Sequence, residues 1–257
     1  MIGAIIGDII GSVYEFRNTF DYDFPLFTKS STYTDDTICT IAVADAILRN
    51  RPYKDSLLDW CRRYPHPMGG YGVSFARWLR SDNPQPYDSF GNGAAMRVSP
   101  VGWAFNSETD CQREAIASAA CSHSHAEGII GALSVARMIR DVRLTRFQQA
   151  VHLIRANINH LYRTDWEKHI PKKGVFDETC QGCVPLAAHI VLQSNSFEDA
   201  VRKAVSYGGD SDTVGAIVGS IAEPMFGIPK EIEKAALSRL PDEMLAVVKQ
   251  FKDLYYE

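Results

Sequence analysis

The chain has 257 residues, 46% of them hydrophobic, which is enough to bury a sizeable core in one large domain or two small ones. Its formal net charge is -4, and its lysines and arginines are scattered, which excludes the basic stripe of a nucleic-acid-binding protein. The apolar N-terminal run contains Asp8, lacks a basic leader and is too short to span a bilayer. We therefore expect a soluble, cytoplasmic protein with no membrane partner.

Gly3, Gly7 and Gly11 recur every four residues at the N-terminus, and Glu15 continues the row. Residues four apart lie along one ridge of a helix, and glycines on that ridge allow a neighbouring element to approach closely. The pattern predicts helix packing along the ridge, with Glu15 at its end, either in a functional site or in solvent. For Asp8 a supporting role and a solvent-facing position are both open.

Apolar residues recur every three to four positions in five longer segments, as in amphipathic helices. In chain order these segments are 38–50, 110–122, 127–142, 146–162 and 241–256. Prolines and glycines fall between such segments, and runs that alternate apolar and polar residues are not evident. We predict an all-α fold in which residues 1–257 form a single compact domain. The irregular stretches 17–33 and 163–183 are expected to be ordered loops.

The six cysteines are sparse for this length and lie mostly in helical contexts, which favours reduced thiols over a disulfide framework. Cys180 and Cys183 form a CxxC motif, but no second pair follows at zinc-ribbon spacing and the surroundings are unlike those of thioredoxin. A lone CxxC is weak evidence for a metal or redox site, so its role stays open.

Two short acidic segments, "YTDDT" and "GGDSDT", each precede a helix of small and apolar residues. Each supplies two aspartates and a threonine, namely Thr34, Asp35 and Asp36 in the first and Asp210, Asp212 and Thr213 in the second. Helix capping explains one such side chain at a time, but not four carboxylates. If the two helix starts face one another, repulsion raises the carboxylate pKa values unless cations bind. Oxygen donors without histidine or cysteine suit two hard divalent ions such as Mg²⁺ or Mn²⁺.

Six segments of the chain, in the same order, resemble the ADP-ribosylglycohydrolase family, which includes the ADP-ribosyl-acceptor hydrolases and the glycohydrolase that reactivates dinitrogenase reductase. The segments are "GAIIGDIIGSVYE", "YTDDT", "GGYG", "SFGNGAAMRVSPVG", "SHSHAEG" and "GGDSDTVGAIVGSIAE". The resemblance covers most of the chain and implies an all-α fold with a binuclear Mg²⁺ or Mn²⁺ centre at the base of an ADP-ribose cleft.

The resemblance also implies roles for individual residues. The metal ligands it implies are Thr34, Asp35, Asp36, Asp210, Asp212 and Thr213, and Glu15 matches an acidic residue that takes part in catalysis. The substrate-binding residues it implies are Gly70, Ser89, Phe90, Gly91, Asn92 and His123, with loop amides around the diphosphate and ribose. Ser74 stands where some members have glycine, so the first loop is expected to hold the ligand differently.

The activity implied is a metal-dependent hydrolysis of the glycosidic bond between ADP-ribose and an acceptor, a reaction that develops oxocarbenium character at the ribose. The acceptor is not identified, since arginine, serine, O-acetyl-ADP-ribose and nucleic-acid conjugates share the same ADP-ribose half. One alternative is an inactive ADP-ribose-binding or structural protein of the same fold, as in J1 crystallins. Another is a two-metal phosphodiesterase, but such enzymes usually place histidines among their ligands, and neither acidic segment has one nearby.

Overall fold

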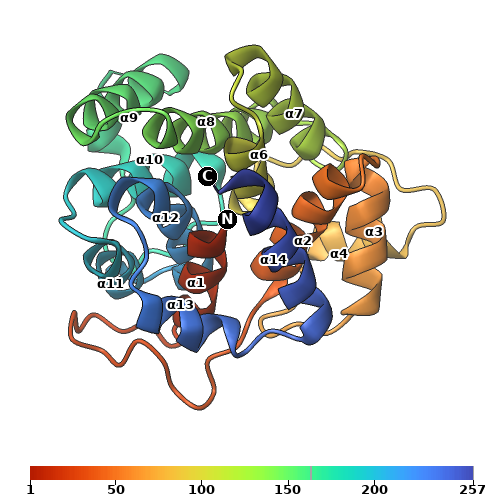
Figure 1. The fold of residues 1–257 in the computed structure, drawn as a ribbon, viewed down its shortest axis with the longest axis horizontal. Helices are drawn as coiled ribbons and strands as arrows, with labels where there is room; N and C mark the ends of the chain where they lie inside the picture. Colours follow the sequence, from red (N-terminus) through yellow and green to blue (C-terminus); the bar gives the residue numbers. More distant parts are fainter. Residues whose placement is uncertain (163, 257) are drawn as a thin grey trace.

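The computed structural model describes residues 1–162 and 164–256. This part of the chain forms fourteen α-helices and one short 3-10 helix, and its extended residues pair only in isolated bridges (Figure 1). The helices are α1 (Ile2–Gly11), α2 (Asp35–Leu48), α3 (Tyr53–Arg63), α4 (Val73–Arg80), α5 (Gly93–Met96), α6 (Ser99–Ala104), α7 (Glu108–Ala120), α8 (Ala126–Arg143), α9 (Phe147–Leu161), η1 (Trp166–His169), α10 (Cys180–Leu192), α11 (Phe197–Tyr207), α12 (Ser211–Phe226), α13 (Lys230–Leu237) and α14 (Asp242–Tyr255). The all-α prediction is confirmed, and the five periodic segments correspond to α2, α7, α8, α9 and α14.

Helix α1 is buried along its whole length and lies near the middle of the molecule, against α12 (Figure 1). Gly3 and Gly7 of α1 face Gly219 and Gly215 of α12, so the two helices run antiparallel. A Cβ atom on Gly7 would overlap the carbonyl oxygen of Gly215, which means that only glycine permits this approach. Because of the antiparallel order, Gly11 at the end of α1 meets the first residues of α12.

The prediction that Glu15 continues the helical ridge of α1 is wrong, because α1 ends at Gly11. Beyond it the side chain of Asn18 donates to the carbonyl oxygens of Tyr14 and Glu15, at 2.8 and 3.1 Å. Such local bonds from asparagine compete with helical hydrogen bonding and favour a turn. Glu15 therefore stands on a turn next to α1.

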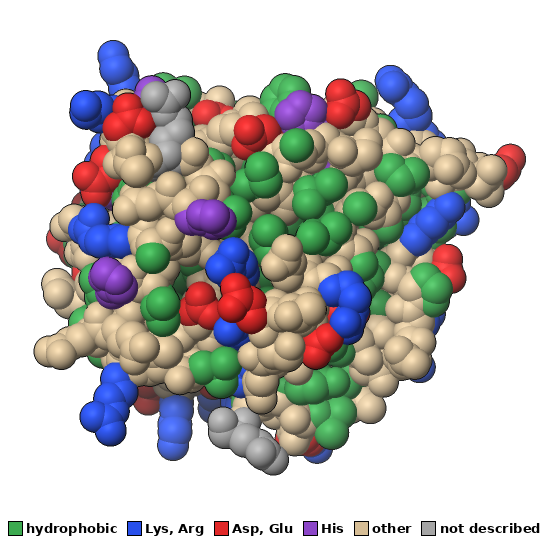
Figure 2. Space-filling model, turned by 90° about the horizontal axis from the view of Figure 1, so that it is seen from above, with side chains coloured by type: hydrophobic (Ala, Val, Ile, Leu, Met, Phe, Trp, Pro, Cys, Tyr) green, Lys and Arg blue, Asp and Glu red, His purple; other side chains and the backbone are tan. Residues whose placement is uncertain are grey.

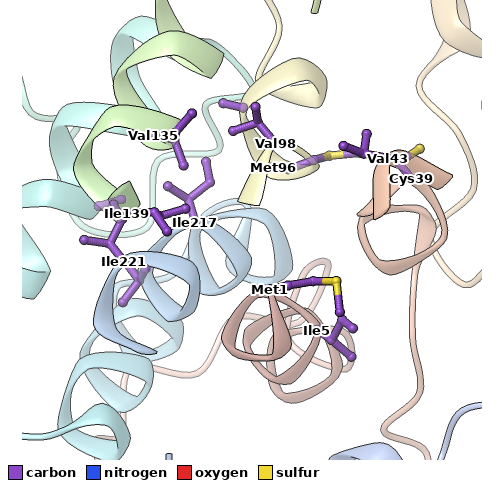
Figure 3. Packing of buried hydrophobic residues seen from close by; sticks show 14 of the residues in the cluster. Met1, Ile5, Cys39, Val43, Met96, Val98, Val135, Ile139, Ile217 and Ile221 are labelled. Carbon is purple, nitrogen blue, oxygen red and sulfur yellow. The ribbon is translucent and has the colours of Figure 1, made fainter. Parts of the chain in front are cut away.

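Buried apolar side chains from along the described chain form one cluster. In Figure 3, Ile217 and Ile221 of α12 lie beside Val135 and Ile139 of α8. On this basis we propose one domain over 1–257, the last residue of which lies outside the described part.

The first irregular stretch, 17–33, is held by side chains from late in the chain. Arg202 of α11 donates to the carbonyl oxygen of Phe24 at 2.8 Å, and Arg239 donates to that of Ser31 at 3.2 Å. These bonds satisfy backbone groups that a loop cannot pair within itself.

The second irregular stretch, predicted over 163–183, is partly helical. Arg163 lies outside the described residues, and η1 covers Trp166–His169. Helix α10 begins at Cys180, earlier than predicted, because the side chain of Thr179 caps it.

None of the helices in the described ranges is long and apolar enough to cross a membrane. On the side of α7, α8 and α9, seen from above in Figure 2, basic side chains lie among acidic ones, in agreement with their scatter along the sequence.

Candidate active site

A cleft of about 460 Å³ lies where segments far apart in the sequence meet. Its walls come from the turn after α1, the first turns of α2 and α12, and the loops that precede α4, α5, α8 and α10. The predicted site residues that line it are Glu15, Asp35, Asp36, Gly70, Ser89, Gly91, Asn92, His123, Asp210, Asp212 and Thr213. Ser74 lines it too, whereas Thr34 and Phe90 do not.

Asp8 of α1 is fully buried and accepts four hydrogen bonds from the start of α2. The donors are the backbone N–H groups of Thr34 and Thr37, each at 3.0 Å, and the hydroxyl groups of both residues. Thr34 also caps α2, because its hydroxyl oxygen accepts from the N–H of Asp36 at 3.2 Å. Asp8 thus supports the first turn of α2, from which Asp35 and Asp36 reach the cleft.

The second acidic segment stands at the start of α12. Asp210 occupies the N-cap position without a capping bond from its side chain, and its Oδ2 accepts instead from Asn92 Nδ2 at 2.7 Å. The Thr213 hydroxyl donates to Oδ1 of Asp36 at 3.4 Å. The structure therefore brings the two acidic segments together, and capping does not account for the second one.

Glu15 reaches the same place from the turn after α1. One oxygen each from Glu15, Asp210 and Asp212 lie within 4.8 Å of one another. The turn is tied to the segment before α12, because Asn18 donates to the Gly209 carbonyl and accepts from the Gly209 N–H, both at 2.9 Å. Asn18 thereby sets the distance between Glu15 and the acidic start of α12.

The carboxyl groups of the cleft have pKa values above their ordinary range. Burial first, and then repulsion from Asp210, raises the pKa of Glu15 to about 7. Burial and neighbouring carboxylates raise the pKa values of Asp36 and Asp212 well above the ordinary value, and the pKa values of Asp35 and Asp210 shift in the same direction. Carboxylates in this arrangement stay ionised only when positive charge neutralises them.

Two buried carboxylate oxygens in the cleft, Asp36 Oδ2 and Asp212 Oδ1, have no hydrogen-bond partner among the described residues. Leaving one buried acceptor unpaired costs about 1–3 kcal/mol, and more when it is charged. A divalent cation with oxygen ligands would satisfy both atoms. The donor set therefore fits a hard cation, and the position of Glu15 places its carboxylate among the candidate ligands as well.

Four residues of the predicted amide cradle for the diphosphate use their N–H groups for hydrogen bonds within the chain in this structure. The bonds run from Gly70 to the Pro67 carbonyl (3.2 Å), from Ser89 to the Tyr87 carbonyl (2.7 Å), from Gly91 to the Ser89 hydroxyl (3.2 Å) and from Asn92 to the Glu178 carbonyl (2.7 Å). Tight turns consume their own amides, and buried amides seldom stay free. Side chains of these loops therefore remain the candidate ligand contacts.

Phe90 lies outside this cleft, and its side chain is 47% exposed. It lines a neighbouring cavity of about 480 Å³, which shares Ser89 and Gly91 with the cleft. His123 is buried beside the cleft, and desolvation lowers its pKa to about 3.

The CxxC cysteines lie in the first turn of α10 and pack under the loop that carries Asn92. The Cys180 thiol donates to the Gly91 carbonyl at 3.3 Å, and the Cys183 thiol donates to the Asp177 carbonyl at 2.9 Å. Asn92 Nδ2 also contacts the Cys183 sulfur at 3.3 Å. Burial raises the pKa of Cys180 to about 12, so this thiol stays protonated and inert.

Sequence reasoning missed several residues that line the cleft. The rings of Phe16 and Phe176 stack at 6.0 Å, and repulsion from Glu178 adds to the raised pKa of Glu15. These three stand on irregular loops that have no periodicity to reveal them. Arg97, in contrast, lies inside one of the segments that carry the family resemblance.

Comparison with known proteins gives relatives that align with most of the chain. The ADP-ribosylhydrolase ARH3 of Bos taurus is 23% identical, with 89% of this chain and 84% of that protein aligned. The ADP-ribosyl-dinitrogen reductase glycohydrolase of Rhodospirillum rubrum is 24% identical, with 93% and 88% aligned. The ADP-ribosylarginine hydrolase Tri1 of Pseudomonas putida (strain GB-1) is 24% identical, with 93% and 74% aligned.

A solved ADP-ribosylglycohydrolase-related protein complex contains the same fold, with a TM-score of 0.75 at 22% identity over 99% of this chain and 97% of that one. The family model described as ADP-ribosylglycohydrolase matches residues 1–256. The chain therefore belongs to the ADP-ribosylglycohydrolase family.

Proposed function

We propose that the protein hydrolyses the glycosidic bond between ADP-ribose and an acceptor, and so reverses mono-ADP-ribosylation. The observation that carries this proposal is the convergence of five predicted carboxylates in one cleft, which residues of the loops before α4 and α5 also line. The names of the relatives, which are hydrolases of ADP-ribosyl groups, support it.

We further propose that two divalent cations, Mg²⁺ or Mn²⁺, bind in the cleft. The residues that would hold them are Asp35, Asp36, Asp210, Asp212 and Thr213, whereas Thr34, which the resemblance also implies, does not line the cleft. The unpartnered buried oxygens of Asp36 and Asp212 support this proposal, whereas the Thr34 hydroxyl already bonds to Asp8 and to the N–H of Asp36. Bound there, the ions would offset the carboxylate charge and polarise a sugar hydroxyl or a water molecule.

Glu15 is the proposed proton carrier. Its half-buried carboxyl group faces the cleft, and the bonds between Asn18 and Gly209 hold its turn beside the acidic start of α12. A carboxylate so placed can take a proton from the attacking water or return one to the leaving group, a role worth about 10²- to 10⁴-fold in rate.

Ser89, Asn92 and His123 are the proposed contacts to the ligand. The amide of Asn92 already fixes Asp210 through its Nδ2, so this residue connects the binding loop to the acidic cluster. A ligand held by the loop would therefore lie next to the carboxylates.

The test is a panel of defined ADP-ribosyl conjugates on arginine, serine, acetate and nucleic acid, incubated with the full-length protein and Mg²⁺ or Mn²⁺. We expect release of free ADP-ribose from at least one conjugate, which would also identify the acceptor. Tight binding of ADP-ribose without release from any conjugate would instead support the inactive, binding-only alternative.

A further inference from the structure

Arg97, which follows α5, is a buried cation beside the cleft. It is 1% exposed and forms no ion pair with a carboxylate in the described parts of the chain. Its Nη2 donates to the Ser118 carbonyl at 2.9 Å and to the Ser122 hydroxyl oxygen at 2.7 Å. Ser118 lies in the last turn of α7, where helix carbonyls and the helix dipole stabilise a positive charge.

Ser122 links Arg97 to His123 through hydrogen bonds. The Ser122 hydroxyl oxygen lies 2.8 Å from Nδ1 of His123. Arginine can only donate, so Ser122 accepts from Arg97 and keeps its own hydrogen for another acceptor. That acceptor is Nδ1, because the nearby Cys121 thiol donates to the Ser118 carbonyl and sulfur accepts only weakly.

The imidazole of His123 is neutral, since burial and the charge of Arg97 both lower its pKa. A neutral ring carries one N–H group, and when Nδ1 accepts, the hydrogen is on Nε2. Nε2 has no hydrogen-bond partner among the described residues, and the ring lines the cleft. A Cβ atom on Gly93 would come within 3.2 Å of Nε2, so glycine at this position keeps the space before the ring open.

We infer that Arg97 and Ser122 are positioning residues that hold His123 as the Nε2–H tautomer, which donates a hydrogen bond to an oxygen atom of the bound ligand. The ligand's identity rests on the proposed function and would be a diphosphate or ribose oxygen of ADP-ribose. The neighbouring loop amides of Ser89, Gly91 and Asn92 are already engaged, which leaves the imidazole as an available donor on this wall. His123 then binds the ligand without transferring a proton.

The experiment combines ¹⁵N NMR of histidine-labelled full-length protein with calorimetric titration of ADP-ribose in the presence of Mg²⁺. We expect a single Nε2–H tautomer for His123 at neutral pH. Ser122→Ala should lose this single tautomer and bind ADP-ribose about tenfold more weakly. The matched control is Ser118→Ala, a buried serine in the last turn of α7 whose hydroxyl bonds only within that helix and whose backbone carbonyl is kept, and it should leave both readouts unchanged.

An Nδ1–H or protonated His123 in the wild type would overturn the inference, and so would an unchanged tautomer in Ser122→Ala. The wild-type spectrum needs no variant, so the assignment is tested even if Ser122→Ala fails to fold. The expected tautomer in a protein that does not bind ADP-ribose would refute the proposed function and leave the positioning by Arg97 and Ser122 intact.

Discussion

The hydroxyl of Thr213 donates to the carboxylate of Asp36 at 3.4 Å and joins two helix starts that are 177 positions apart in the chain. Placing the aspartates of one helix start beside those of the other does not by itself stabilise the fold. Burial first, and then repulsion from neighbouring carboxylates, raises the pKa values of Asp36 and Asp212. The contact is compatible with the cations proposed above, which would offset the charge of both segments.

Activity should depend on a divalent cation. Chelation of the purified protein should abolish release of ADP-ribose from its acceptor, and Mg²⁺ or Mn²⁺ should restore it, because oxygen donors without histidine or cysteine select hard ions. Full activity in protein shown by elemental analysis to be free of metal would refute the two-cation proposal.

Asp36→Asn and Asp212→Asn should have opposite effects with and without metal. In metal-free protein each variant removes a buried carboxyl group that must either bind a proton at neutral pH or remain charged and repelled, and should raise the free energy of unfolding by about 1 kcal/mol. With Mg²⁺ or Mn²⁺, each should lose the rise in Tm that cation binding produces in the wild type. The losses of activity should be far from additive in the double variant, as expected for one site.

The control for this pair is Asp110→Asn in the first turn of α7, where the side chain is 43% exposed and the change in stability should be less than about 0.5 kcal/mol in either condition. If Asp36 and Asp212 served only to stabilise the helix starts, their variants would retain activity and change stability by the same small amount with and without metal, because asparagine replaces aspartate at a helix start at little cost.

Glu15→Gln should separate binding from chemistry. The amide preserves size and one coordinating oxygen but cannot accept a proton as a carboxylate does, so turnover should fall about 10²- to 10⁴-fold while ADP-ribose still binds. Calorimetry of ADP-ribose binding and turnover of an ADP-ribosylated acceptor, under the same metal conditions, give the two readouts. Loss of both would indicate that Glu15 mainly holds the cation, as its proximity to Asp210 and Asp212 allows. Normal turnover would remove Glu15 from the active site.

Gly7→Ala should destabilise the fold, because the new methyl group would overlap the backbone of Gly215 in α12. Overpacking of this kind typically costs about 1–3 kcal/mol, measured as a change in the free energy of denaturant unfolding. The control is Gly72→Ala, where an added Cβ meets nothing within 4 Å and φ is -51, so its cost should be only that of a poorer N-cap residue of α4, below about 1 kcal/mol. Equal stability of the two variants would show that α1 and α12 are not in close contact.

His123 should make the fold sensitive to mild acid. Its pKa falls from the ordinary value of 6.5 to about 3 through burial and the charge of Arg97. Between pH 6.5 and about pH 3, His123 binds a proton in the unfolded chain but not in the folded chain. The free energy of unfolding is therefore unaffected by this group above pH 6.5 and decreases as the pH falls below it. Relative to His123→Gln, the wild type should lose about 2 kcal/mol between pH 7 and pH 5. A constant difference between the two proteins over this range would mean that the folded protein protonates His123 normally.

Local patterns were sufficient for the five periodic helices and for the identity of the acidic segments. A three-to-four-residue apolar period indicates which face of a segment is buried. The row of glycines that ends at Gly11 indicates where another backbone can approach. Both features depend on residues a few positions apart, so the sequence alone determined them. The same applies to membership of the family, which short ordered motifs carry.

Only the tertiary structure determined which polar groups have hydrogen-bond partners within the chain and which can bind a ligand. Asp8 was ambiguous in the sequence because its four donors lie on another helix, and Asn18 escaped notice because its partner, Gly209, is 191 positions away. The sequence predicted that the N–H groups of Gly91 and Asn92 bind the ligand, but in the structure both donate hydrogen bonds within the chain. A hydrogen-bonding group is satisfied by whatever helix packing places within about 3 Å, and residue spacing along the chain does not determine that neighbour.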